Sequence, residues 1–214
     1  MPSSSALKRR ALALCPPGLV FYRGPKTAKR LALSFDDGPH QLTDEYLRVL
    51  DELDVPATFF LMGDLLEASP HMLRRYVERG HQVASHGYDH RAFPSLTFAE
   101  LRAQLAQTQA ALGAQPTPRP WVRPPYQKLT PKTLASLIRL GFTVALSSVD
   151  SLDYGQTATP DIVAACTRDD IGAGDIFMFH EGLPATLAAL PAIVAHWRAR
   201  GYAFVTMADM MQLA

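Results

Sequence analysis

The stretch Leu31-Ala-Leu-Ser-Phe-Asp-Asp-Gly-Pro39 determines how the rest of the chain is interpreted. Large apolar and small residues alternate from Leu31 to Phe35, and this alternation predicts a short strand buried in a sheet. The strand ends on two adjacent carboxylates, Asp36 and Asp37, and the chain turns at once through Gly38-Pro39. Two like charges at the end of an apolar run repel each other and resist burial. They need a metal ion, an arginine or a shared proton as compensation, unless they belong to a solvated Asp-Gly turn.

Predicted strands and helices alternate along the chain, which is the pattern of a mostly parallel α/β fold. Further strands are expected at residues 57–61, 82–85, 121–122, 142–148, 175–179 and 203–206. One helix is expected to begin at a Thr43 cap, and a second, after the strand at 57–61, to run up to Arg79. A capping box formed by Thr97 and Glu100 predicts the start of a helix over 97–113, and Thr130-Pro131 predicts the start of a helix over 130–141. Two more helices are expected, one beginning at Thr159 and one including 193–197. Unusual polar residues follow several different strands, whereas an open doubly wound sheet would draw its site from only a few. The pattern therefore favours a barrel, one strand short of eight, whose strand ends converge on one mouth.

Length and composition favour a single globular domain. The 214 residues are enough for one full hydrophobic core, and no repeats or long linkers divide them. With 21 basic and 20 acidic side chains the net charge is +1, so there is no electrostatic case for a nucleic-acid partner. Two cysteines, Cys15 and Cys166, form neither a metal spacing nor a disulfide framework. We expect a domain over residues 29–214, preceded by an N-terminal arm over residues 1–28, and we favour a monomer.

The N-terminal arm has only a faint likeness to a signal peptide. The basic run Lys8-Arg9-Arg10 precedes a short apolar run that Pro16-Pro17 interrupts, and this run is too short to span a bilayer. We therefore favour a plain arm over a surface-lying or cleaved segment. No transmembrane span is expected, and a cytoplasmic or membrane-peripheral location is favoured over secretion.

His86 and His90 are four residues apart, so both side chains can share one face of a helical turn or straddle a tight loop. Together with one carboxylate they can form a three-ligand metal site with an open position, which is the arrangement of hydrolytic zinc sites. The same ligand set serves non-haem iron, so the ligands alone do not name the metal. Two unconnected surface histidines are the alternative.

If either Asp36 or Asp37 binds a metal, the other is free to act as a general base. Arg123 can pair with the free carboxylate and keep it ionised. His180 follows an apolar run and can protonate a leaving group, while Asp153 can hold that histidine charged. Alternatively, His180 bonds only to a backbone carbonyl and Asp153 caps a loop.

Five ordered segments carry a resemblance to a known family: Ser34-Phe-Asp-Asp-Gly-Pro39, His86-x-x-x-His90, Arg123-Pro-Pro-Tyr126, Asp150-x-x-Asp153-Tyr154 and Phe177-Met-Phe-His180. They resemble the motifs of polysaccharide deacetylases, the NodB-homology group or carbohydrate esterase family 4. The resemblance runs from about Lys29 to the C-terminus. It implies a distorted (β/α)7 barrel and metal-dependent removal of acetyl groups from sugars, with Zn²⁺ as the cofactor and Co²⁺ as a possible substitute.

The resemblance also assigns roles to individual residues. It implies that Asp36 is the general base and His180 the general acid, with Arg123 steadying Asp36 and Asp153 tuning His180. The metal ligands that it implies are Asp37, His86 and His90.

The resemblance places four further residues at the substrate and shows three departures from the usual motifs. The backbone N–H of Tyr126 is implied to hold the oxyanion, and Tyr154, where the family has tryptophan, still offers a ring to a sugar. Phe177 and Phe179 are expected to line the pocket for the acetyl methyl group in place of the usual leucines. Gly87 replaces a serine or threonine that bonds within the histidine loop, a change that concerns the rigidity of the loop.

These observations predict a hydrolase that removes N-acetyl groups from acetylated amino sugars. An amide nitrogen leaves readily only when it is protonated, so a dedicated acid such as His180 is worth most for amide cleavage. An O-acetyl esterase of the xylan type and a non-catalytic carbohydrate-binding domain are the alternatives, and an iron oxygenase lacks further support. The expected partner is an acetylated saccharide, and the sequence does not distinguish chitin oligomers, peptidoglycan, other glycoconjugates or xylan.

Overall fold

The computed structural model of the protein describes residues 15–212. In this part of the chain nine strands form a parallel sheet in the order β1-β6-β5-β4-β3-β2-β8-β7, with β9 paired to β2. Their bounds are β1 Val20–Phe21, β2 Arg30–Gly38, β3 Thr58–Leu61, β4 Gln82–Ser85, β5 Trp121–Val122, β6 Thr143–Ala145, β7 Val149–Asp150, β8 Ile176–His180 and β9 Ala203–Phe204. The predicted distorted (β/α)7 barrel in a single domain is confirmed by this curled parallel sheet and its surrounding helices.

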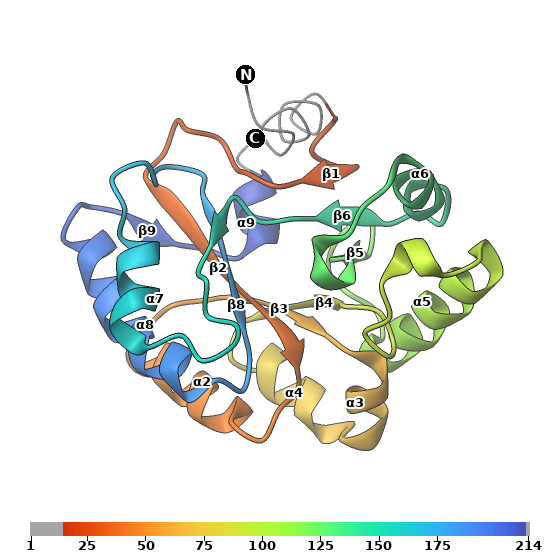
Figure 1. Ribbon diagram of the computed structural model, residues 1–214, viewed down its shortest axis with the longest axis horizontal. Coiled ribbons are helices and arrows are strands. Elements are labelled where there is room, and N and C mark those ends of the chain that lie inside the picture. The colour runs from red at the N-terminus through yellow and green to blue at the C-terminus, as the bar shows by residue number, and fades with distance from the viewer. Residues whose placement is uncertain (1–14, 213–214) are drawn as a thin grey trace.

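Helices α2 to α8 lie along the outer side of the curled sheet, whereas α9 lies within the curl against β2 (Figure 1). Their bounds are α2 Thr43–Glu52, α3 Gly63–Ala68, α4 His71–Val77, α5 Phe98–Leu112, α6 Pro131–Arg139, α7 Thr159–Cys166, α8 Pro184–Arg198 and α9 Met207–Gln212. Two 3₁₀ turns, Phe93–Ser95 and Pro125–Gln127, lie in the connections after β4 and β5. None of the helices within residues 15–212 combines the length and apolar character that crossing a membrane requires.

Strand β2 lies at the centre of the core, as its apolar alternation predicts. The Phe35 ring stacks on Phe59 of β3 with centroids 5.0 Å apart and on Phe179 of β8 with centroids 5.5 Å apart. Leu31 and Leu33 belong to the same buried cluster. Burial of such side chains stabilises a fold by about 1.5–3 kcal/mol each, so β2 and β8 are held firmly where they lead into the polar residues that follow.

The predicted capping signals hold at two helices and fail at one. Thr97 and Glu100 form a reciprocal capping box at the start of α5, and the Thr130 hydroxyl accepts the N–H of Thr133 at the start of α6. The prediction that Thr43 caps α2 is wrong, because Leu42 occupies the cap position and Thr43 is the first residue of the helix. The Thr43 hydroxyl accepts the N–H of His40 (2.8 Å) and donates to the buried Glu181, so a tertiary contact uses it instead.

Several element boundaries also differ from the predictions. The helix expected up to Arg79 is divided into α3 and α4, because Pro70 cannot supply the N–H that a continuous helix needs. The strand expected at 203–206 ends at Phe204, and the Thr206 hydroxyl accepts the N–H of Asp209 at the start of α9, a helix not predicted from the sequence. Of the arm predicted over residues 1–28, only residues from 15 onward are described, and they include β1, which pairs with β6.

Candidate active site and metal centre

The carboxyl ends of the parallel strands open into one pocket of about 690 Å³. Polar side chains from β2, from the loops after β4 and β5, from the β7–α7 loop and from β8 line this pocket together. The lining includes Asp36, Asp37, His86, His90, Tyr126, Gln127, Asp150, Tyr154, Met178, His180 and Glu181. The convergence predicted from the distribution of polar residues along the sequence is therefore present in the fold.

The two adjacent aspartates occupy different environments because the end of β2 is irregular. The pairing register between β2 and β3 shifts between Phe35 and Gly38, and Asp37 has a left-handed backbone with φ of 71°. Asp36 remains in regular pairing opposite His180 and is buried, whereas the side chain of Asp37 is partly exposed. This local geometry allows the two neighbouring carboxylates to serve different functions.

Asp36 forms a buried ion pair with Arg123. The Arg123 Nη1 atom lies 2.7 Å from Asp36 Oδ1 and donates a second hydrogen bond to Ser34 Oγ at 2.9 Å. Burial lowers the pKa of Arg123, and the charge and hydrogen bond of Asp36 oppose that effect. The Arg123 guanidinium also lies 4.0 Å from the ring centroid of Phe60. Breaking a buried pair of this kind leaves an uncompensated charge, so each partner compensates the buried charge of the other.

Asp37, His86 and His90 each direct one ligand atom to a common point, with these atoms within 4.8 Å of one another. Asp37 Oδ1 lies 3.3 Å from His86 Nε2 and 3.1 Å from His90 Nε2. Burial raises the pKa of Asp37, but the contacts with both imidazoles outweigh it and hold the pKa well below its usual range. The carboxylate is therefore ionised and available to a cation.

The hydrogen bonds around this cluster fit a metal ion. His86 Nδ1 lies 2.9 Å from the Arg123 carbonyl oxygen, which can only accept, so Nδ1 is the donor and Nε2 is the ring nitrogen left for a metal ion. The buried Oδ1 of Asp37 lacks a well-aligned hydrogen-bond donor among the described residues. Two imidazoles and one carboxylate are the donor set of a hydrolytic zinc site with an open position.

Gly87 is explained by the geometry of the histidine loop. Its backbone has φ of 83°, and a Cβ atom there would approach the Phe93 ring to 2.9 Å. A serine at this position would be strained in both respects. The loop is instead fixed by the Ser85 hydroxyl, which accepts the Gly87 N–H at 3.2 Å, and by Phe93.

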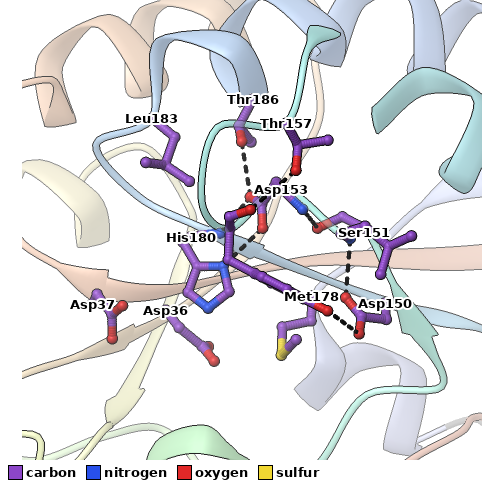
Figure 2. A network of polar contacts seen from close by, with 12 residues as sticks. Asp36, Asp37, Asp150, Ser151, Asp153, Thr157, Met178, His180, Leu183 and Thr186 are labelled. Carbon is purple, nitrogen blue, oxygen red and sulfur yellow. Dashed lines mark hydrogen bonds and ion pairs between the residues drawn. The ribbon is translucent and has the colours of Figure 1, made fainter. Parts of the chain in front are cut away.

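His180 and Asp153 form a second polar pair at the pocket (Figure 2). His180 Nδ1 donates to Asp153 Oδ1 at 2.8 Å, which leaves the other ring nitrogen on the side facing Asp36. Burial lowers the pKa of His180, but the hydrogen bond and charge of Asp153, with smaller contributions from Asp36 and Asp37, raise it to about 9. His180 is therefore protonated at neutral pH and able to donate a proton.

The predicted lining of the pocket by Phe177 and Phe179 is wrong. Both rings are fully buried in the core, where they stack on each other with centroids 6.2 Å apart. Side chains alternate along β8, so Met178 shares the pocket face with His180 and the two phenylalanines point the other way. Met178 therefore occupies the position that the prediction gave to the phenylalanines.

Tyr126 and Tyr154 line the pocket as exposed aromatic rings. Their exposed fractions are 62% and 52%, which is unusual for side chains of this size. The Tyr126 ring contacts His90 edge-on with centroids 4.5 Å apart, and the Tyr154 ring lies at right angles to His180 at 6.1 Å. The Tyr126 ring thus lies beside the cluster of Asp37, His86 and His90, and the Tyr154 ring lies beside the His180–Asp153 pair.

Several residues of the site were not predicted. Gln127 lines the pocket and donates from Nε2 to Ser147 Oγ at 2.7 Å, although nothing in its sequence context marks it. Glu181 is buried beneath the Asp37-Gly38 turn and accepts hydrogen bonds from Tyr76 and Thr43, while burial raises its pKa to about 7. Its position directly after His180 was the one available sequence signal.

Comparisons with known proteins identify the family of the chain. The polysaccharide deacetylase family model matches residues 23–145. The chain is 33% identical to the peptidoglycan-N-acetylglucosamine deacetylase PgdA of Listeria monocytogenes over 86% of its own length and 39% of that relative. It is 34% identical to a chitooligosaccharide deacetylase of Bradyrhizobium over 71% of its own length and 70% of the relative.

Solved structures agree with the sequence comparisons. The Bc1960 peptidoglycan N-acetylglucosamine deacetylase superposes with a TM-score of 0.85 at 28% identity, covering 92% of this chain and 94% of that one. The chain spans about two fifths of the length of the Listeria protein, so it corresponds to one part of that relative. The match of the family model over more than half of the residues, together with the Bradyrhizobium relative, shows that the chain belongs to the polysaccharide deacetylase family.

Proposed function

We propose that the protein is a metal-dependent hydrolase that removes N-acetyl groups from saccharides containing N-acetylglucosamine. The observation that carries the proposal is the arrangement around one pocket of a buried Asp36–Arg123 pair, a three-ligand cluster and a protonated His180 held by Asp153. These are a base, a metal centre and an acid, the three functions that amide hydrolysis by water requires. Relatives named for deacetylating peptidoglycan N-acetylglucosamine and chitooligosaccharides support the choice of substrate.

Asp37, His86 and His90 are the residues that would hold the metal, because their donor atoms and hydrogen bonds fit a divalent ion. When bound, zinc or cobalt would supply Lewis acidity, which acidifies water and polarises an acetyl carbonyl. The partly exposed side of the cluster, at Asp37 and His90, faces the pocket, where a saccharide can approach.

Asp36 takes one proton from the attacking water as the water oxygen bonds to the acetyl carbon. Its ion pair with Arg123 fixes the orientation of the carboxylate and places a positive charge beside it. The resulting oxyanion needs a donor, which the backbone N–H of Tyr126 at the mouth of the pocket can provide.

His180 then gives its proton to the amide nitrogen as the carbon–nitrogen bond breaks. The products are acetate and a free amine, and the net reaction consumes one water molecule. The proton held by Asp36 returns to His180 through solvent, which restores both groups for the next cycle. The exposed rings of Tyr126 and Tyr154 offer apolar faces to the sugar during these steps.

The metal assignment predicts about one divalent ion per chain in protein purified without chelators. The double substitution His86→Ala, His90→Ala is expected to abolish this binding, because it removes two of the three ligands. His71→Ala, which changes an exposed histidine at the start of α4, is the matched control and should leave the metal content unchanged. Elemental analysis of the three proteins is the measurement. Stoichiometric metal in the double variant would show that the ligands lie elsewhere.

The substrate assignment predicts release of acetate from N-acetylglucosamine oligomers and from peptidoglycan fragments. The test measures acetate from these saccharides and from acetylated xylan, with zinc or cobalt added. The metal-free His86→Ala, His90→Ala variant is the control for background hydrolysis. Acetate from xylan alone would establish an O-acetyl esterase instead, and saccharide binding without acetate release would establish a non-catalytic carbohydrate-binding domain.

A further inference from the structure

Thr186 lies in the first turn of α8, where the short connection from β8 returns it to His180 (Figure 2). Its side chain is fully buried, and its hydroxyl donates to Asp153 Oδ2 at 2.8 Å. The two residues are 33 positions apart in the sequence, so this contact exists only in the folded chain.

The Asp153 carboxylate accepts three hydrogen bonds in a buried environment. Oδ1 accepts the His180 ring Nδ1 at 2.8 Å, and Oδ2 accepts both the His180 backbone N–H and the Thr186 hydroxyl, each at 2.8 Å. The carboxylate is shielded from solvent, so fixed donors must replace water around its charge. Thr186 supplies the one donor of the three that does not belong to His180.

Because the Thr186 hydroxyl is not part of His180, it still donates to Asp153 after His180 gives up its proton. Before the transfer, the imidazolium neutralises the charge of Asp153, and afterwards the carboxylate is a buried anion beside a neutral ring. A hydrogen bond from a neutral hydroxyl is stronger to the carboxylate that is no longer neutralised by its partner. The Thr186 hydroxyl therefore stabilises the state after proton transfer more than the state before it.

We propose that Thr186 is a positioning residue that acts through Asp153 to favour proton donation by His180. The inference rests on the proposed function, in which His180 protonates the leaving amine. Other titratable groups face His180 as well, namely Asp36 and Asp37 on β2, His90 in the loop after β4, Asp150 at the end of β7, and Glu181, and all of them remain when Thr186 is changed.

A purely structural role for the Thr186 hydroxyl is disfavoured by the contacts of Tyr46. The Tyr46 hydroxyl donates to the Leu183 carbonyl at 2.7 Å and lies 3.3 Å from the carbonyl oxygen of His180. Tyr46 thus already ties the connection between β8 and α8 to α2. The Thr186 side chain also interacts with the Tyr46 hydroxyl, but the bond from Tyr46 to the Leu183 carbonyl does not involve Thr186 and stays when the Thr186 hydroxyl is removed. We therefore expect the main effect of that removal at Asp153.

The test compares Thr186→Val and Thr186→Ala, which lack the hydroxyl, with Thr186→Ser, which keeps it. Each zinc-loaded variant is assayed on an N-acetylglucosamine oligomer and on 4-nitrophenyl acetate, whose phenolate leaves without being protonated. We expect kcat on the amide to fall by about tenfold to a hundredfold in the valine and alanine variants, since a hydrogen bond to a charged group is lost. The serine variant should stay within about threefold of the wild type on both substrates, and all variants should hydrolyse the aryl ester at wild-type rates.

Thermal unfolding and zinc content check that each variant is folded and contains zinc. If Thr186→Val does not fold, the comparison of Thr186→Ala with Thr186→Ser still tests the hydroxyl. Equal loss on the amide and the aryl ester, loss in the serine variant, or no loss in the hydroxyl-free variants would each overturn the role of Thr186. Failure of the wild type itself to deacetylate the oligomer would instead refute the proposed function, so the two failures are distinguishable.

Discussion

Asp36→Asn is expected to lower turnover by about 10²–10⁴-fold while the metal stays bound, because a neutral amide cannot accept the proton of the attacking water. The substitution changes one atom of a side chain that lies in the pocket but outside the three-ligand cluster. The Asn oxygen can still accept the hydrogen bond that Arg123 Nη1 gives to Asp36 Oδ1. The loss should therefore appear in kcat, with the pocket otherwise intact.

Asp37→Asn is the matched control, since it makes the same chemical change one residue away. It removes the charge of a proposed ligand and is expected to weaken metal occupancy. The measurement is the rate of acetate release from an N-acetylglucosamine oligomer, together with the metal content per chain. If Asp36→Asn loses the metal and Asp37→Asn keeps it, the two roles are exchanged and the argument from Arg123 fails with them.

Asp36→Asn also leaves the Arg123 charge without its counter-ion. Removing one member of a buried ion pair costs about 3–5 kcal/mol, so the variant should unfold at a lower temperature than the wild type. If the variant unfolds at a lower temperature but is still folded and binds metal stoichiometrically at the assay temperature, its rate still tests the role of Asp36 as general base. Thermal unfolding with the metal bound provides this check.

The sequence alone predicted the elements whose signals are local. Alternation identified β2, and the capping box identified the start of α5 with its cap at Thr97. The convergence of the pocket residues also followed from the sequence, because the carboxyl ends of parallel strands meet on one side of a barrel. The predictions of β2 and of the α5 cap depend on neighbours within a few residues, for which a single sequence is informative, whereas the convergence follows from the rule that all the parallel strands end on the same side.

The predictions were wrong where the position of a side chain depends on which face of a strand it occupies, or on a contact with a residue far away in the sequence. The face of β8 could have been assigned from His180, since a residue two positions earlier must share its side, which selects Met178 and excludes Phe177 and Phe179. Thr43 looked like a helix cap because its local sequence is typical of one, but its hydroxyl faces Glu181, 138 residues away. Thr186 also has no local signal for its role, because its partner Asp153 lies 33 residues away in the sequence.

His180→Ala is expected to lower N-deacetylation by about 10²–10⁴-fold and to affect ester cleavage much less. An amide nitrogen is a poor leaving group until it is protonated, and His180, which lines the pocket and has its pKa raised to about 9, can supply that proton at neutral pH. The alkoxide of an ester leaves more readily and depends less on an acid.

The variant is expected to remain folded, because the Asp153 carboxylate keeps two of its three donors when the imidazole is removed. The backbone N–H of residue 180 and the Thr186 hydroxyl both still reach Oδ2, so the buried charge is not left without partners. Acetate release from an N-acetylglucosamine oligomer and from acetylated xylan, compared between wild type and variant, measures the effect. Intact N-deacetylation by His180→Ala, or release of acetate only from xylan by the wild type, would show that the amide bond is not the one this pocket is built to cut.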